Sequence, residues 1–454
     1  MPSDSTIGRL RWLGTRRRFL NLTLTGGAFA AIAPFLLSAR SPSKKLNLGF
    51  IGVGGQGAVN LEAGSSENVA ALCDVNETVL ASAARKYPHA RRYVDYRKMF
   101  EDSARLDGVV ISTPDHTHAL AVMLALKRKL HVYCETPLAH SVWEARMIAQ
   151  AFERARVATQ MGNQFHSCEN YRRVVELIWH GVIGPVREAH VWVSHTFGWR
   201  PAAGGGTDGD TGIQKPPAEG EPPPKELHWD LWLGPAPERP FHSAYYPSPN
   251  WQRWWDFGGG TLAALGGQWL DLVCWALKLN QPRTISAYGP PPNEDLAPAS
   301  MSANYFFGVR SDMPSLKVSW HQGLNKPPIL QKGKIPSWEN GVLFVGDEGM
   351  LLADADKYIL LPEENFRGFK PPQPSIPGPK SHFAEWIEAC KEGKPTGCNF
   401  DYASTLTEII QLANVAYRVG KMLQWDPVNL RATNCPNAES LIINNFRKGW
   451  ELPL

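Results

Sequence analysis

Short runs of apolar residues alternate with segments of helical periodicity between positions 46 and 165. We expect buried strands and intervening helices, with strands at 46–53, 69–73, 108–112 and 130–134, and helices at 58–64, 77–86, 119–127 and 142–154. Apolar strands that alternate with helices are typical of a parallel sheet covered on both faces. The pattern therefore predicts an α/β domain over residues 46–165.

The strands expected after residue 165 are longer, and apolar and polar positions alternate along them. They lie at 188–197, 284–288, 303–309, 316–320, 341–345 and 357–361, with helices at 171–179, 262–279, 382–392 and 402–422. Alternation indicates a mostly antiparallel sheet, with helices on one face. Stretches rich in proline and glycine at 201–224, 289–298 and 370–379 are expected to be loops, the first a lid near the site. The pattern predicts a second, α+β domain over residues 166–454.

The first 39 residues carry the whole formal net charge of +4, because they hold five arginines and a single acid. Arg16, Arg17 and Arg18 precede an apolar stretch, and small residues follow it. This arrangement resembles a twin-arginine export signal, so we expect a signal peptide at 1–39 and a periplasmic protein. An uncleaved membrane anchor is the alternative, although the stretch is shorter than the ~20 residues of a span and contains Pro34. The rest of the chain is formally neutral, which gives no electrostatic reason to expect nucleic acid.

The composition is that of a globular protein, with 454 residues, 43% of them hydrophobic and 20% charged. It excludes a disordered chain and a multi-span membrane protein. The seven cysteines are scattered without a CxxC pair, and no cluster of histidine and cysteine has zinc spacing. We therefore expect no disulfide framework and no metal site, and only Cys390 and Cys398 lie close enough in sequence to suggest a bridge.

A glycine-rich sequence follows the first expected strand and precedes the first expected helix; it reads Gly52-Val53-Gly54-Gly55-Gln56-Gly57. The first glycine permits the tight turn, the second lets the backbone approach a pyrophosphate, and the third allows close helix packing. N–H groups at the helix end then face the phosphates. Asp74 ends the next strand 20 residues after Gly54, where it suits the ribose hydroxyls of NAD and repels the 2′-phosphate of NADP. The sequence predicts a dinucleotide site for NAD, with NADP less favoured.

Two further motifs follow strands of the same sheet, Ser-Thr-Pro-Asp-His-Thr-His at 112–118 and Tyr-Cys-Glu-Thr-Pro-Leu at 133–138. With the segments at 160–164, 229–235, 254–258 and 399–402, they resemble the Gfo/Idh/MocA oxidoreductase family along nearly the whole chain. The resemblance implies a Rossmann domain followed by an open, mostly antiparallel sheet, and a homo-oligomer. It also implies a sugar or cyclitol substrate, NAD(P) as cofactor, and a tightly held nucleotide in exported members. It assigns cofactor contacts to Thr113, Pro114 and His118, to Glu135 at the nicotinamide ribose, and to Gln164 near the nicotinamide.

Two positions that carry acid–base chemistry in that family are replaced. The family's Glu-Lys-Pro motif is Glu135-Thr136-Pro137 here, so a threonine stands where a lysine stabilises charge on the reacting hydroxyl. The second-domain motif keeps Asp271, but Gln268 replaces the histidine that exchanges the proton, and Ala264 replaces an aspartate. Neither Thr136 nor Gln268 can act as a base near neutrality. A positioned base contributes about 10²–10⁴-fold to the rate, so the replacements bear directly on activity.

The candidates for the missing acid–base role are His166, His195, Tyr171 and Asp271. His166 stands beside the expected nicotinamide site, and an imidazole titrates near neutral pH. Three functions remain open: an oxidoreductase that acts on a hydroxyl of a sugar, cyclitol or glycoside, a glycoside hydrolase or lyase with retained NAD, and an NAD- and sugar-binding protein without turnover. The whole-chain resemblance disfavours a Rossmann protein of unrelated chemistry.

Overall fold

The computed structural model describes residues 44–102, 106–199, 215–310, 313–332, 335–378 and 381–454, all within one compact unit. The expected signal peptide and residues 201–214 of the first proline-rich loop lie outside the described residues. Among the helices that the structure describes, none combines the length and the apolar character needed to cross a membrane.

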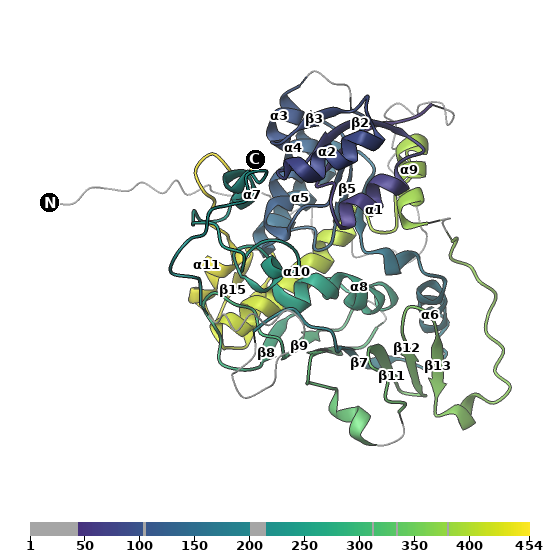
Figure 1. The fold of residues 1–454 in the computed structure, drawn as a ribbon. Coiled ribbons are helices and arrows are strands. Elements are labelled where there is room, and N and C mark those ends of the chain that lie inside the picture. The colour runs from purple at the N-terminus through teal and green to yellow at the C-terminus, as the bar shows by residue number, and fades with distance from the viewer. Residues whose placement is uncertain (1–43, 103–105, 200–214, 311–312, 333–334, 379–380) are drawn as a thin grey trace, which may run out of the picture. The chain divides into compact units, whose positions relative to one another are not determined.

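The first half of the described chain forms a six-stranded parallel sheet in the order β3-β2-β1-β4-β5-β6 (Figure 1). Its elements are β1 (Asn47–Ile51), α1 (Gln56–Ala63), β2 (Asn68–Cys73), α2 (Glu77–Lys86), β3 (Arg91–Tyr93), α3 (Tyr96–Glu101), β4 (Gly108–Ile111), α4 (His118–Lys127), β5 (His131–Glu135), α5 (Val142–Ala155) and β6 (Thr159–Gly162). Strand order reverses beside β1, so the carboxyl ends of β1 and β4 border a crevice of the kind in which such sheets bind nucleotides.

The second half is built on a nine-stranded sheet in the order β13-β12-β11-β7-β10-β9-β8-β14-β15. Its elements are α6 (Glu169–Trp179), β7 (Val186–Val193), α7 (Trp229–Leu233), α8 (Gly260–Ala276), β8 (Thr284–Tyr288), β9 (Met301–Phe307), β10 (Leu316–Gln322), β11 (Gly341–Gly346), β12 (Met350–Ala353), β13 (Tyr358–Leu361), α9 (His382–Glu392), α10 (Phe400–Val419), β14 (Leu423–Asp426), β15 (Arg431–Ala432) and α11 (Glu439–Ile442). Only β7 and β10 pair in parallel among its described strands. The predicted fold class, a Rossmann sheet followed by a mostly antiparallel α+β sheet, is confirmed.

Several predicted elements need correction. Strand β7 ends at Val193 instead of position 197, and the short strands β3, β6, β12, β14 and β15 were not expected, because two to four residues carry little periodicity. Helix α9 was expected to cover the second sheet, which is wrong. Its residues Phe383 and Trp386 share a core with Phe50 of β1 and Tyr133 of β5, and Figure 1 shows α9 beside α1. Helical periodicity gives the buried face of a helix but not the sheet that covers it.

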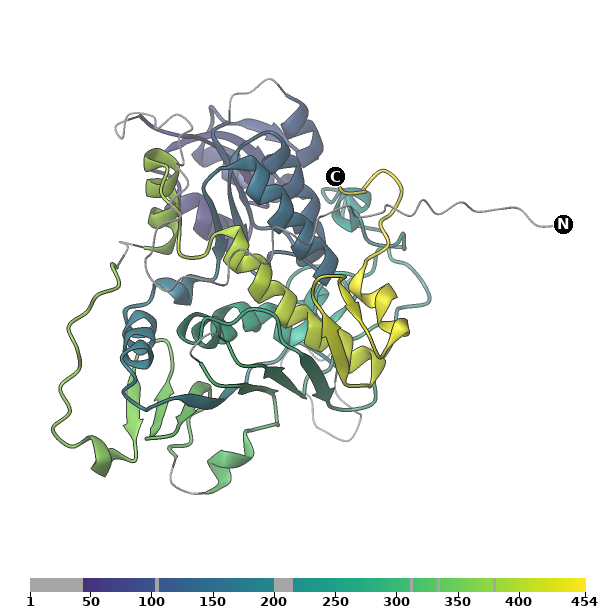
Figure 2. The same ribbon diagram turned by 180° about the vertical axis from the view of Figure 1, so that it is seen from behind.

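The two sheets are joined through packed helices. Helices α5 and α10 lie side by side in both views (Figures 1 and 2) and share one apolar core with α8. Across their contact, Arg146 forms a two-pronged salt bridge with the buried Glu408, at 2.7 and 2.8 Å. The end of β6 is therefore held in a fixed position against α8.

Candidate functional site

The glycine-rich loop runs from β1 into α1 in the conformation that its residues require. Gly52 and Gly55 have positive φ angles of 76° and 50°, which glycine adopts without strain. A Cβ atom on Gly57 would lie 1.9 Å from the carbonyl oxygen of Gly52, so no side chain fits there. A Cβ on Gly54 would lie 3.0 Å from Val79 of α2, and Gln56 is the first residue of α1. The loop thus brings backbone and the helix N-terminus to the position where a pyrophosphate binds in such folds.

Asp74 lies at the end of β2 and holds this loop in place. Its Oδ2 accepts a hydrogen bond from the backbone N–H of Val53 at 2.9 Å, and its Oδ1 accepts one from Asn76 at 2.9 Å. Burial raises the pKa of Asp74, while these backbone bonds act in the opposite direction. Each carboxylate oxygen has two lone pairs, so Asp74 can still accept bonds from ribose hydroxyls.

Glu135 ends β5 and is surrounded by amide donors. Asn60 of α1 donates to its Oε1 at 2.7 Å, and Gln164 donates to its Oε2 at 3.3 Å. Gln56 donates to Oε1 over a longer 3.4 Å. Burial raises the pKa of Glu135, and these donors oppose the rise. The carboxylate is therefore fixed beside the glycine-rich loop, where the family resemblance puts the nicotinamide ribose.

Gln268 is part of the same hydrogen-bond network. Its Nε2 donates to Oε1 of Gln164 at 2.7 Å, and its Oε1 accepts the backbone N–H of Phe165 at 3.0 Å. A continuous relay of amide and carboxylate groups thus runs from α8 through Gln164 and Glu135 to Asn60 on α1. We call this set of four side chains the amide relay. Glu135 is its only titratable member.

Thr136 does not face open space. A Cβ atom on Gly267 of α8 would lie 1.9 Å from its Oγ1, which shows how closely the threonine side chain meets the helix backbone. The hydroxyl is buried and has no hydrogen-bond partner among the described residues. Thr136 packs directly against the backbone of Gly267, so the space that a longer side chain at position 136 would need is filled.

His166 and Asp271 form a buried pair one helical turn beyond Gln268. Nδ1 of His166 lies 2.9 Å from Oδ2 of Asp271, and Tyr402 donates to Oδ1 at 2.6 Å. The imidazole stacks on Trp275 at 3.9 Å between ring centroids, and it is only 5% exposed. Tyr171, predicted as another candidate, is fully buried and donates from its hydroxyl to the backbone oxygen of Gln268 at 3.0 Å, which makes it a support of α8.

The remaining predicted residues lie around this centre. His118 bridges the carbonyl oxygens of Pro137 and Thr113 at 2.8 Å each, and burial lowers its pKa. Thr113 accepts a bond from a neighbouring threonine at 2.7 Å, and Pro114 precedes a short 3-10 helix. These residues brace the two loops that follow β4 and β5. His195 is exposed past the end of β7, with its ring against Phe197.

A segment of the second half lies along the end of β2. We call residues 226–246 the strap. The N–H of His228 donates to the carbonyl oxygen of Val75 at 2.9 Å, and Asn76 donates to the hydroxyl of Tyr246 at 3.0 Å. The strap thus contacts the two residues that follow Asp74, at the edge of the expected adenosine site.

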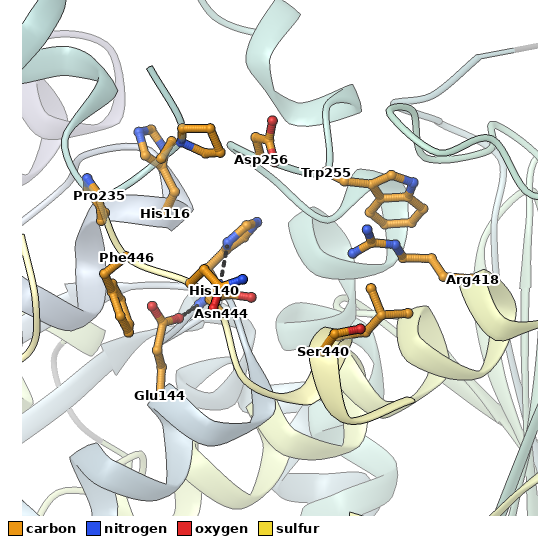
Figure 3. A pocket seen from close by; sticks show the side chains of 14 residues that line it. His116, His140, Glu144, Pro235, Trp255, Asp256, Arg418, Ser440, Asn444 and Phe446 are labelled. Atoms are coloured by element: carbon orange, nitrogen blue, oxygen red, sulfur yellow. Dashed lines mark hydrogen bonds between the residues drawn. The ribbon is translucent and has the colours of Figure 1, made fainter. Parts of the chain in front are cut away.

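A cavity of about 190 Å³ lies behind the turn that follows β5 (Figure 3). Burial lowers the pKa of His140 to about 4 and raises that of Glu144 to about 7. The guanidinium carbon of Arg418 lies 5.0 Å from the centre of the Trp255 ring, and Figure 3 shows the two side chains next to each other. No residue predicted to bind cofactor or to act in catalysis lines this cavity, so it is separate from the nucleotide crevice.

Family profiles match both halves of the chain. The profile described as "Oxidoreductase family, NAD-binding Rossmann fold" matches residues 46–163. The profile described as "Oxidoreductase family, C-terminal alpha/beta domain" matches residues 172–299 and 365–452. The chain belongs to the Gfo/Idh/MocA oxidoreductase family. Its first domain is therefore an NAD-binding Rossmann domain.

Curated relatives in this family match over part of the chain. The rhizopine catabolism protein MocA of Rhizobium meliloti is 25% identical over 179 residues, which cover 38% of this chain and 55% of that protein. The myo-inositol 2-dehydrogenase of Thermotoga maritima is 27% identical over 142 residues, which cover 31% of this chain and 42% of that protein. The chain thus spans about half the length of the curated relatives it matches.

Solved structures extend the likeness over the whole fold. The structure of GenD2 from gentamicin A biosynthesis, in complex with NAD, covers 86% of this chain and 99% of its own, with a TM-score of 0.57 and 17% identity. At that identity the likeness concerns the fold alone. It agrees with the Rossmann sheet and the second, mostly antiparallel sheet described above.

Two parts of the site were not predicted from the sequence. Asn60 is 4% exposed on α1 and donates to both Glu135 and Ser112, at 2.7 and 2.9 Å. A polar residue on the buried face of a predicted helix is a sequence signal that could have identified Asn60. The contacts of the strap with the residues after β2 join positions about 150 residues or more apart and leave no local pattern.

Proposed function

We propose that this chain is an NAD-dependent oxidoreductase that acts on a ring hydroxyl of a sugar, cyclitol or glycoside and holds its NAD tightly. The observation that carries the proposal is the combination of the glycine-rich loop, Asp74 and Glu135 at one crevice of the Rossmann sheet. The names of the relatives, which include a myo-inositol dehydrogenase, support this substrate class.

The residues of the chain divide the work of holding the cofactor. The glycine-rich loop offers backbone N–H groups to the pyrophosphate, and the negative charge of Asp74 favours ribose hydroxyls over a 2′-phosphate. Glu135, oriented by Asn60 and Gln164, accepts bonds from the nicotinamide ribose. NAD, when bound, would accept the hydride from the carbinol carbon, and the proton of the hydroxyl would pass to water or to the exposed imidazole of His195. The amide relay keeps Gln164 and Gln268 in fixed positions beside the nicotinamide.

Tight retention of NAD follows from the strap. It is hydrogen-bonded to the residues directly after Asp74, and the 2.7 Å contact between Nε2 of His228 and Oε1 of Glu77 in α2 adds a further tie. We propose that these contacts open before a nucleotide leaves the crevice. We therefore expect slow release of NAD. Slow release suits a protein that is exported in the folded state with its nucleotide bound, and we propose that residues 1–39 direct this export.

A second function, NAD and sugar binding without turnover, is favoured by one observation. Thr136 is packed against Gly267 and Gln268 is held in the amide relay, so neither supplies a proton acceptor. His166 is buried against Asp271 and Trp275. Of the six residues predicted to be catalytic, His195 alone is exposed, and it lies past the end of β7.

Turnover on a panel of sugars, cyclitols and nitrophenyl glycosides distinguishes these functions. The oxidoreductase predicts that at least one substrate reduces the bound NAD, seen as NADH absorbance, with a ketone product by mass spectrometry. Cleavage of the glycoside without net NADH would instead indicate the hydrolase or lyase reaction. Binding of sugar by calorimetry with no product of either kind would refute catalysis. His195→Gln, compared with His180→Gln on the surface, tests whether the exposed imidazole contributes.

Localisation and assembly are measured separately. We propose export by the twin-arginine route, so replacement of Arg16 and Arg17 by lysine should retain the protein in the cytoplasm of the producing cell. Periplasmic recovery of that variant would refute the route.

We also propose a homo-oligomer. Light scattering of the purified protein that gave the mass of a single chain would exclude it.

A further inference from the structure

Three side chains of metal-binding type meet in the buried region beyond Gln268. One nitrogen of His166, one carboxylate oxygen of Asp271 and the sulfur of Cys398 all lie within 4.8 Å of one another. They are 5%, 0% and 0% exposed. Cys398 is a free thiol, as are the other six cysteines. Imidazole, carboxylate and thiolate are the ligands that zinc takes in proteins.

A fourth polar group at this place has no ordinary partner. The side-chain amide of Asn163, at the end of β6, lies next to the Cys398 sulfur. The side chain is fully buried, and neither its oxygen nor its nitrogen has a nitrogen or oxygen partner in the described structure. The amide nitrogen can donate to the Cys398 sulfur, which leaves the amide oxygen without a donor among the described residues. A buried oxygen without a donor costs free energy, so it indicates a missing interaction. A metal ion beside the sulfur, or a water bound to that ion, would supply it.

The surroundings also resemble those of a ligand set that is held in place. Tyr402 donates to the Asp271 carboxylate at 2.6 Å, and the His166 ring is fixed by stacking on Trp275. Such outer partners orient ligating carboxylates and imidazoles in metal sites. Cys398 is fixed through its backbone, because its carbonyl oxygen accepts the N–H of Met161 at 2.9 Å. Ligand atoms around tetrahedral zinc lie about 3.5 Å apart, so shifts of about 1 Å close the set.

We propose that His166, Asp271 and Cys398 bind one zinc ion, with the amide of Asn163 at the fourth position directly or through a water. Two negative ligands and a neutral imidazole balance the charge of Zn²⁺, which a buried site requires. The ligands come from the segment after β6, from α8 and from the loop before α10. The ion therefore fastens the segment that follows the Rossmann sheet to α8 and to the loop before α10, and its role is structural.

The test measures zinc directly in the full chain purified with its nucleotide. After dialysis against a mild chelator, mass spectrometry of the elements should find about one zinc per chain. Cys398→Ser should lose it, and the matched control Cys390→Ser, another buried thiol, should keep it. Removing zinc with a strong chelator should lower Tm, and added Zn²⁺ should restore it. The protein refilled with Co²⁺ should show thiolate-to-cobalt charge-transfer absorption.

Two results would overturn the zinc site. One is zinc no higher in the wild type than in Cys398→Ser, together with a Tm that added Zn²⁺ does not change. The other is cobalt absorption that persists in Cys398→Ser. If that variant does not fold, absence of thiolate-to-cobalt absorption in the wild type is enough to refute the proposal. Nucleotide content is measured on the same samples, so loss of the zinc site is distinguished from failure of NAD binding.

Discussion

Asp74→Asn tests how the chain selects its nucleotide. The substitution keeps the shape of the side chain but leaves one acceptor oxygen where Val53 and Asn76 now use two. Loss of one charge-assisted hydrogen bond costs about 1.5–3 kcal/mol, which corresponds to roughly 10- to 100-fold weaker NAD binding. A carboxylate about 4 Å from a phosphate charge repels it by about 4 kcal/mol near a protein surface. The variant removes that repulsion, so the preference for NAD over NADP should fall at least about 100-fold.

The assay has two parts. Nucleotide released from the purified variant by acid is identified by chromatography, and calorimetry on nucleotide-free protein gives Kd for NAD and NADP. Asp95→Asn is the matched control, because Asp95 accepts a backbone N–H at the start of α3 in the same way, at 2.9 Å. We expect that control to bind both nucleotides as the wild type does. An unchanged ratio of the two Kd values in Asp74→Asn would show that Asp74 does not face the ribose.

Three further predictions concern stability and the loop. Burial raises the pKa of Glu144 from 4.5 to about 7, so its contribution to stability is present below pH 4.5 and is lost as pH rises through about 7. The wild type should lose about 3 kcal/mol of unfolding free energy between pH 4.5 and pH 7 that Glu144→Gln does not lose. Curves of unfolding free energy against pH that run parallel for the two proteins would contradict this prediction. Gly57→Ala forces the new Cβ onto the carbonyl oxygen of Gly52. NAD should therefore be absent from the purified variant, and the free energy of unfolding should fall by about 1–3 kcal/mol. A variant that keeps its full NAD content would refute the close approach of the two backbones. Arg146→Met leaves the buried Glu408 carboxylate without its arginine and should lower the free energy of unfolding, measured by chemical denaturation, by about 3 kcal/mol. Most of that loss should be recovered when Glu408→Met is added. A single variant as stable as the wild type would argue against a contribution of the pair.

The nucleotide crevice was predictable because its parts are local in sequence. Gly52 follows β1, Gly57 lies in the first turn of α1 and Asp74 follows β2, and the geometry of a parallel sheet brings the carboxyl ends of these strands to one edge. Each glycine is required by a close approach or a positive φ angle that the sequence pattern already implies. The role of each residue in binding is still a prediction.

The state of the replaced catalytic positions was not predictable. The sequence shows that Thr136 and Gln268 stand where a lysine and a histidine are expected, but not that Gly267 fills the adjacent space or that Gln164 engages the glutamine. These contacts join elements from two domains. His166 likewise looked like a candidate base, whereas the structure buries it against Asp271, 105 residues away.

The expectation of no metal site rested on ligand spacing along the chain. Spacing rules detect ligands that share a short loop or a helix face. His166, Asp271 and Cys398 belong to three separate segments, and only the packing of α8 and α10 against the end of β6 brings them together. The sheet that α9 covers was predicted wrongly, because periodicity carries no information about which distant surface a helix covers.

The nucleotide content of the protein as purified tests the central claim most directly. Acid release followed by chromatography and mass spectrometry should give about one NAD per chain, without NADP and without added cofactor. The same preparation should survive gel filtration and dialysis with its NAD in place, because the strap ties the second domain to the residues after Asp74. A chain that folds, as judged by circular dichroism, but neither carries nor binds NAD would contradict the account of the glycine-rich loop, Asp74 and Glu135 together.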